Sequence, residues 1–207
     1  MKSLITVILM LCLASIAFSQ TPMSIGGQVG LNLSNLSFDP SITPSPSTRT
    51  DFGVGALLEV GVSEMFFIQP ELMYLTGGAK FDYTGGSSTF KYDVITIPIL
   101  VKAKFTAGDI KPYVFAGPEI GFTMKSELEN DPTSGTSTTV DQKDSTESMN
   151  LSVDFGAGAE YNLDAKTSLF GDLRYSLGLT NLSKAASATE KIKTTGFQIF
   201  VGVKFGI

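Results

Sequence analysis

The sequence predicts an all-β fold, namely an eight-stranded antiparallel up-and-down transmembrane β-barrel. Apolar and polar residues alternate along most of the chain with the period of two that is typical of strands. Long and short connections separate these segments in strict turn, as in barrels with long loops at one end and short turns at the other. No stretch after the first twenty residues holds 18 consecutive apolar residues, so a membrane-spanning chain of this kind requires a closed barrel.

The N-terminus has the pattern of a secretory signal peptide. Lys2 supplies a positive start, residues 4–13 are apolar, and small residues precede Gln20. The sequence therefore predicts a signal peptide over 1–19 and an outer-membrane β-barrel domain over 20–207. An N-terminal membrane anchor is the alternative, but the apolar run is short for one.

The composition excludes several kinds of chemistry. The chain has no histidine, one cysteine and a formal net charge of -5. Cys12 is the cysteine and falls in the expected signal peptide, after the large residue Leu11, which does not suit a lipoprotein site. We therefore expect no cofactor, no metal site, no disulfide and no histidine-based catalysis in the mature domain. The acidic balance also argues against nucleic acid as a partner.

Eight segments show the alternation and are predicted as strands. Residues 151–163 are an example, because Leu151, Val153 and Phe155 face one way whereas Ser152 and Asp154 face the other. Most of the segments reach the ~9–11 residues that a tilted strand needs to cross a bilayer. In chain order the segments are 25–36, 51–62, 66–78, 90–105, 111–124, 150–163, 167–180 and 194–207.

The connections alternate in length and composition. Short connections are expected near 63–65, 106–110 and 164–166. The long connections are polar and rich in Ser, Thr, Gly and Pro, and they are expected near 37–50, 79–89, 125–149 and 181–193. The stretch 125–149 is acidic and of low hydrophobicity, so a mobile solvated loop is the expectation there.

Three prolines conflict with a closed barrel. Pro70, Pro98 and Pro118 fall inside predicted strands. Proline cannot donate a ladder hydrogen bond, and a closed barrel has no free edge to accommodate it. We expect bulges or a local loss of ladder bonds at these positions.

The polar face indicates which side of the barrel wall is inside. Eight strands enclose a narrow interior, which small and charged residues fit better than a full set of bulky apolar ones. The apolar face then meets lipid, where a charge at mid-membrane costs roughly 2–4 kcal/mol for Lys or Arg. We expect the inward charges to form a structural lumenal network, the alternative being that each charge meets trapped water. The network comprises Glu59, Glu71, Lys102, Lys104, Glu119, Asp154, Glu160, Asp172, Arg174 and Lys204.

A catalytic use of these acids is the weaker interpretation. Glu59, Glu71 and Glu119 could form a carboxylate pair. Balancing the lumenal lysines and arginine is the role that the sequence favours, so we expect no catalytic residue.

Four segments carry a resemblance to a known family. They read FIQPELMYLTGGAKF (67–81), YDVITIPILVKAKF (92–105), KPYVFAGPEIGF (111–122) and FGAGAEYNL (155–163). With them the chain resembles the outer-membrane β-barrel proteins common in Bacteroidetes, the PorT-like relatives of OmpX- and OmpA-type eight-stranded barrels. The resemblance implies a barrel and no particular activity. The C-terminus departs from the pattern, because Gly206 and Ile207 follow Phe205 where such barrels often end on an aromatic residue.

The expected function is a non-enzymatic one in the cell outer membrane. The chain would be a monomer with both termini in the periplasm, surrounded by outer-membrane lipids. It would have a structural role or bind extracellular ligands or envelope proteins through loops 125–149 and 181–193. Three alternatives remain open: a narrow channel for small solutes, an accessory component of a secretion system by family analogy, and a soluble lipid-carrying barrel.

Overall fold

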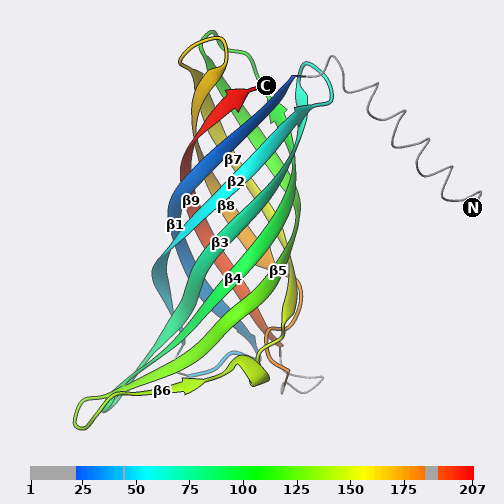
Figure 1. Cartoon of the computed structure of the whole chain (residues 1–207). Helices are drawn as coiled ribbons and strands as arrows, with labels where there is room; N and C mark the ends of the chain where they lie inside the picture. Colours follow the sequence, from blue (N-terminus) through cyan, green and yellow to red (C-terminus); the bar gives the residue numbers. More distant parts are fainter. Residues whose placement is uncertain (1–21, 44, 185–190) are drawn as a thin grey trace, which may run out of the picture.

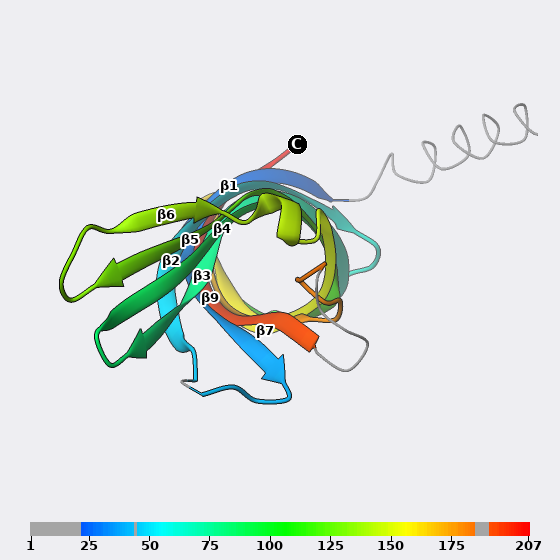
Figure 2. The ribbon, with the colours of Figure 1, turned by 90° about the horizontal axis from the view of Figure 1, so that it is seen from below.

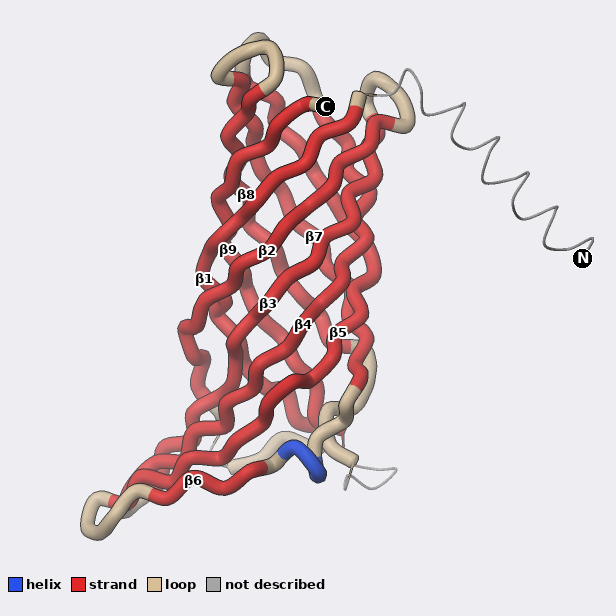
Figure 3. Tube along the Cα trace, viewed as in Figure 1, coloured by secondary structure: helices blue, strands red, loops and turns tan. Residues whose placement is uncertain are grey.

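The computed structural model describes residues 22–43, 45–184 and 191–207, and within them the chain forms a closed antiparallel barrel (Figures 1 and 3). The expected signal peptide, residues 1–19, lies outside the described residues. A short strand, β6, and a 3-10 helix, η2, lie at one end of the barrel. The elements are β1 (Met23–Asp39), β2 (Ser47–Gly61), β3 (Phe66–Tyr83), β4 (Gly86–Lys104), β5 (Ile110–Pro132), β6 (Thr138–Asp141), η2 (Lys143–Ser145), β7 (Met149–Asn162), β8 (Thr167–Gly178) and β9 (Lys191–Gly206).

Eight strands close the barrel, which confirms the predicted fold class. They pair in the order β4-β3-β2-β1-β9-β8-β7-β5, and a further β4–β5 pairing completes the ring. The described chain starts and ends at one end of the barrel, which also carries the three short turns at 62–65, 105–109 and 163–166 (Figure 1). We call this the terminal end and the opposite one the distal end. In the described ranges, no helix has the length and apolarity needed to cross a membrane.

The outer surface of the barrel is an apolar belt. On β4, Ile97, Ile99 and Val101 are 38%, 45% and 52% exposed, whereas Lys102, which directly follows Val101 and points inward, is 1% exposed. The outward positions from 95 to 105 span eleven residues, about the ~9–11 residues with which a tilted strand crosses the hydrocarbon core. The apolar face thus lies outside and the charged face inside, as the alternation predicts. The soluble carrier would need the reverse arrangement.

The strands extend further at the distal end than the sequence indicates. The expected loop 79–89 is instead a hairpin in which Tyr83 pairs with Gly86. The turn between them places Gly85 at φ 102°, a conformation that favours glycine. The expectation for 37–50 is likewise corrected, since β1 runs to Asp39 and β2 starts at Ser47. Residues 181–184 and 191–193 are described, whereas 185–190 lie outside the description.

The acidic stretch 125–149 also has regular structure, contrary to the solvated loop expected there. β5 continues through it to Pro132 and pairs with β6, with Leu128 opposite Val140. The distal parts of β3, β4 and β5 together with β6 form a sheet that projects past the barrel (Figures 1 and 2). Residues 129–141 are mostly polar and are half-buried or exposed, which is why composition indicated a loop.

The three prolines interrupt the ladders without creating bulges. Around Pro70, β2 and β3 lack paired residues between Leu57↔Glu71 and Val60↔Ile68, and the register is the same on both sides. Pro98 lies in an equivalent interruption between β3 and β4, and Pro118 in one between β4 and β5. Each proline thus lacks a paired residue on the preceding strand only. On the following strand, each proline has a paired residue. The expected local loss of ladder bonds is therefore present, one ladder at a time.

Large aromatic side chains share the interior with the glycines, which the sequence reasoning did not anticipate. Phe115 and Phe200 are buried inside, at 5% and 0% exposure. A Cβ added to Gly156 would lie 2.6 Å from Cζ of Phe115, and one on Gly202 would lie 2.5 Å from Cζ of Phe170. The inward glycines therefore leave space for aromatic rings that lie against the inner surface of the barrel wall. The narrow interior holds bulky residues only because glycine faces them.

Candidate functional site

All ten residues of the lumenal charge network point into the barrel and are at most 8% exposed. They come from β2, β3, β4, β5, β7, β8 and β9, because the period of two places them on the inward face of each strand. The structure brings nine of them into two neighbouring clusters and places Glu119 by itself.

The first group, which we call the lysine cluster, lies toward the terminal end. It contains Glu59, Lys102, Lys104, Glu160 and Lys204. Lys104 Nζ lies 2.5 Å from Glu59 Oε1 and 2.8 Å from Glu160 Oε2. Lys204 Nζ lies 3.0 Å from Glu59 Oε1 and also pairs with Glu160, whereas Lys102 Nζ is 3.4 Å from Glu59 Oε2. Three cations thus share two carboxylates, with Glu59 in contact with all three.

Aromatic rings enclose the lysine cluster. Lys102 Nζ lies 3.8 Å from the ring centroid of Tyr113, and Lys104 Nζ lies 4.2 Å from that of Phe67. Such cation–π contacts partly offset the excess of one positive charge in a desolvated site. Lys102 pairs with Glu59, and Lys104 pairs with both Glu59 and Glu160.

The second group, the arginine cluster, comprises Arg174, Glu71, Asp154 and Asp172. Arg174 makes a two-pronged contact with Glu71, with Nη1 and Nη2 donating at 3.0 and 3.1 Å. Nη1 also lies 3.6 Å from Asp154 Oδ2. Asp172 Oδ2 accepts a hydrogen bond of 3.3 Å from the Tyr113 hydroxyl. One cation therefore faces three carboxylates here, the reverse of the lysine cluster.

Gln69 joins the two clusters. Its Oε1 accepts from Lys102 Nζ at 2.9 Å, and its Nε2 donates to Glu71 Oε1 at 2.6 Å. Gln28 Nε2 donates to the other Glu71 oxygen at 2.9 Å. Sequence reasoning named neither glutamine, although both lie at inward positions of their strands and this parity is a signal that could have found them. The amides make one continuous hydrogen-bonded network of two oppositely charged halves.

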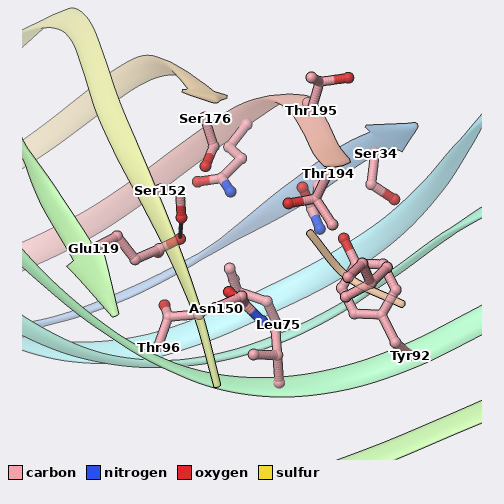
Figure 4. Close-up of a pocket in the computed structure, with 15 residues that line it drawn as sticks. Ser34, Leu75, Tyr92, Thr96, Glu119, Asn150, Ser152, Ser176, Thr194 and Thr195 are labelled. Carbon is pink, nitrogen blue, oxygen red and sulfur yellow. Dashed lines mark hydrogen bonds between the residues drawn. The ribbon is translucent and has the colours of Figure 1, made fainter. Parts of the chain in front are cut away.

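Glu119 stands apart from the basic residues. Its Oε1 accepts a 2.8 Å hydrogen bond from the Ser152 hydroxyl in a small polar pocket (Figure 4). Thr96 and Asn150 line the same cavity of about 40 Å³. Glu119 Oε2 accepts no hydrogen bond from the described residues, and neither do the two Asp154 carboxylate oxygens. Buried acceptors without hydrogen-bond donors cost free energy, so these three oxygens offset part of the stabilisation that the buried ion pairs provide.

The arrangement provides charge compensation inside the barrel. Its carboxylates contact Arg174, lysines and hydroxyl groups, and the lysine cluster opens on a cavity of about 340 Å³ at the terminal end. Within the described ranges, no three His, Cys, Asp or Glu side chains lie close enough to hold a metal ion.

Comparisons with known proteins agree with this architecture. A family model described as the outer membrane protein beta-barrel domain matches residues 18–184. The structure is similar to that of Neisserial surface protein A, with a TM-score of 0.54 at 13% identity over 87% of this chain and 96% of that one. It is also similar to OprG from Pseudomonas aeruginosa, with a TM-score of 0.53 at 12% identity over 90% and 96% of the two chains. At these identities the likeness concerns the fold alone.

A search of curated protein sequences found no match. The family model covers most of the chain, from the end of the expected signal peptide to the distal segment before β9. The apolar belt and the charged lumen described above are what such a domain requires. The chain therefore belongs to the outer membrane protein beta-barrel domain family.

Proposed function

We propose that the chain is a non-enzymatic, monomeric barrel that acts at the cell surface through its distal end. The observation that carries the proposal is the contrast between the two regions of the molecule. The lumen is occupied by buried ion pairs, with Arg174 and Glu71 each at most 3% exposed. The distal sheet of β3, β4, β5 and β6 instead extends into the surroundings (Figure 2).

We infer the orientation of the barrel from the positions of its chain ends and short turns. Both ends of the described chain and the three short turns lie at the terminal end, which we place in the periplasm. The distal sheet and residues 181–184 then face outward, where they would contact extracellular ligands or envelope proteins. Outer-membrane lipids surround the apolar belt.

An accessibility experiment tests this orientation. An epitope tag inserted in the β5–β6 turn at 133–137 should be stained by antibody on intact cells. The same tag in the terminal-end turn at 163–166 should be stained only after the outer membrane is permeabilised. Staining of the second tag on intact cells would contradict the orientation.

A deletion tests the role of the distal sheet. Removing 130–146 eliminates β6 and η2 but leaves the ladder between β5 and β7, which joins Ile110–Phe122 to Met149–Tyr161. The variant should insert and keep its heat-modifiable gel mobility. Cells that carry it should lose adhesion to protein-coated surfaces or become sensitive to detergent. Unchanged adhesion and unchanged sensitivity, with normal insertion, would refute a surface role.

A narrow channel is the second candidate, and the cavity of about 340 Å³ at the terminal end favours it. The path from that cavity meets Glu59, Lys104 and Glu160, which are held together by ion pairs. We expect no single-channel conductance in planar bilayers. Stable conductance steps of the wild-type protein would support the channel instead.

A further inference from the structure

The distal mouth of the barrel contains a small hydrophobic core of its own. Leu36, Ala79 and Leu182 are at most 6% exposed, and four further apolar side chains pack against them. These four are Phe38, Phe81, Phe90 and Ile192. Leu36 and Phe81 occupy inward positions beyond the stretch in which outward residues form the apolar belt. This core therefore cannot be explained by contact with lipid.

The distal core does not fill its space. It borders a cavity of about 220 Å³ walled by Phe38, Phe81, Phe90, Leu128 and Ile192. On this apolar side of the cavity, the aromatic and aliphatic walls offer none of the two to four polar partners that hold a water molecule. An apolar guest would instead gain dispersion contacts with every wall.

One side of the cavity is polar and has unused hydrogen-bonding capacity. Gln142, Ser145 and Thr146 line it. The Thr146 hydroxyl is engaged with the Ser126 hydroxyl and the Gln142 carbonyl, both at 2.8 Å. The Gln142 side chain is half-buried and Ser145 is exposed, and among the described residues neither the Gln142 amide nor the Ser145 hydroxyl takes part in the side-chain hydrogen bonds at this site. These two groups can bind a hydroxyl or carbonyl of a guest.

Backbone hydrogen bonds hold the segment around η2 across this side of the mouth. The Glu147 N–H donates to the Leu182 carbonyl at 2.7 Å, and the Lys184 N–H donates to the Ser145 carbonyl at 3.0 Å. Figure 2 shows the short helix η2 at the mouth when the barrel is viewed from the distal end. Because Leu182 also belongs to the distal core and lines the cavity, it links the segment around η2 to the cavity wall.

We propose that this cavity binds a small, mostly apolar molecule that carries one hydroxyl or carbonyl group. A cavity of about 150 Å³ holds benzene, so the space here suits about ten non-hydrogen atoms. The ring or chain of the guest packs on the phenylalanines, and its polar group bonds to the Gln142 side-chain amide. This inference does not depend on what the distal sheet binds.

Binding of 4-fluorobenzyl alcohol to the full-length mature barrel in lipid nanodiscs tests the proposal by fluorine NMR. The wild type should show saturable binding beyond the partitioning measured with empty nanodiscs. Leu128→Trp fills the cavity and should weaken binding at least tenfold. Thr139→Trp is the matched control, because Thr139 lies on the opposite face of the neighbouring strand β6 and outside the cavity. It should bind as the wild type does.

A second variant examines the polar side and does not depend on whether Leu128→Trp folds. Gln142→Leu should weaken binding of 4-fluorobenzyl alcohol at least threefold but leave binding of 4-fluorotoluene, which lacks the hydroxyl, unchanged. Heat-modifiable mobility checks that each variant is folded. Signals that never saturate, or equal affinity in the wild type and a folded Leu128→Trp variant, would overturn the proposal.

Discussion

Replacing Arg174 by methionine tests whether the lumenal network stabilises the barrel. Arg174 is 1% exposed and donates to both oxygens of Glu71, at 3.0 and 3.1 Å. Methionine keeps most of the volume between the rings of Phe115 and Phe200, whose centroids lie 5.3 and 5.4 Å from the guanidinium carbon. The substitution therefore removes the charge while it limits the cavity.

The expected loss follows from what remains behind. Glu71 and Asp154 would stay buried without their cation, and removing one partner of a buried pair costs about 3–5 kcal/mol. At about 2–4 °C per kcal/mol for a chain of this size, the melting midpoint should fall by roughly 6–20 °C. The chain has no tryptophan, so the folded fraction is best read from gel mobility after incubation at increasing temperature.

Two further variants make the result specific. Arg174→Met combined with Glu71→Gln should recover at least half of the lost stability, because the double variant no longer buries the Glu71 charge. Lys80→Met removes an exposed ion pair of 2.8 Å with Asp82 and should leave the midpoint unchanged. An unchanged midpoint for Arg174→Met, or no recovery in the double variant, would refute a stabilising network and favour charges that merely meet trapped water.

Three further predictions concern other parts of the barrel. Glu59→Gln leaves Lys102, Lys104 and Lys204 with one fewer carboxylate, so unfolding in urea, followed by gel mobility, should require about 3–5 kcal/mol less free energy. Gly30→Ala places a Cβ against the Ile199 carbonyl oxygen and 2.6 Å from Phe200 Cδ1, which should cost about 1–3 kcal/mol. The control Gly27→Ala, where the nearest atom is 3.9 Å away, should be neutral in the same urea assay. In the turn at 163–166, the backbone N–H groups of Lys166 and Thr167 donate to the Asp164 carboxylate and lower its pKa below the usual 3.8. The ionised carboxylate therefore stabilises the fold fully above pH 3.8, and this stabilisation is lost as the pH falls through the lowered pKa. Asp164→Ala should therefore destabilise the barrel at pH 7, and its melting midpoint should converge with that of the wild type at strongly acidic pH.

Local sequence pattern accounts for the wall of the barrel. The alternation around Ile99, Val101, Lys102 and Lys104 assigns each side chain to one face, because successive residues of a strand point in opposite directions. The same parity also places Gln69 and Phe200 inside, although the sequence reasoning considered only small and charged inward residues.

The pairing of charges depends on register and closure. Glu71 and Arg174 are 103 positions apart and lie on strands that do not pair with each other. They meet only because the sheet curves into a ring. No local pattern could assign Lys104 to Glu59 and Glu160, or leave Glu119 with Ser152.

The sequence by itself determined the strand number, the inward and outward faces and the short turns, because these depend on period two and on turn composition. It did not determine that the distal connections pair into a sheet, since polar residues are compatible with a solvated strand as well as with a loop. Only the tertiary structure decided that the lumenal charges divide into a lysine cluster and an arginine cluster, and that apolar residues meet around a cavity at the distal mouth. Both features arise from contacts across the barrel, where distance in the sequence carries no information about distance in space.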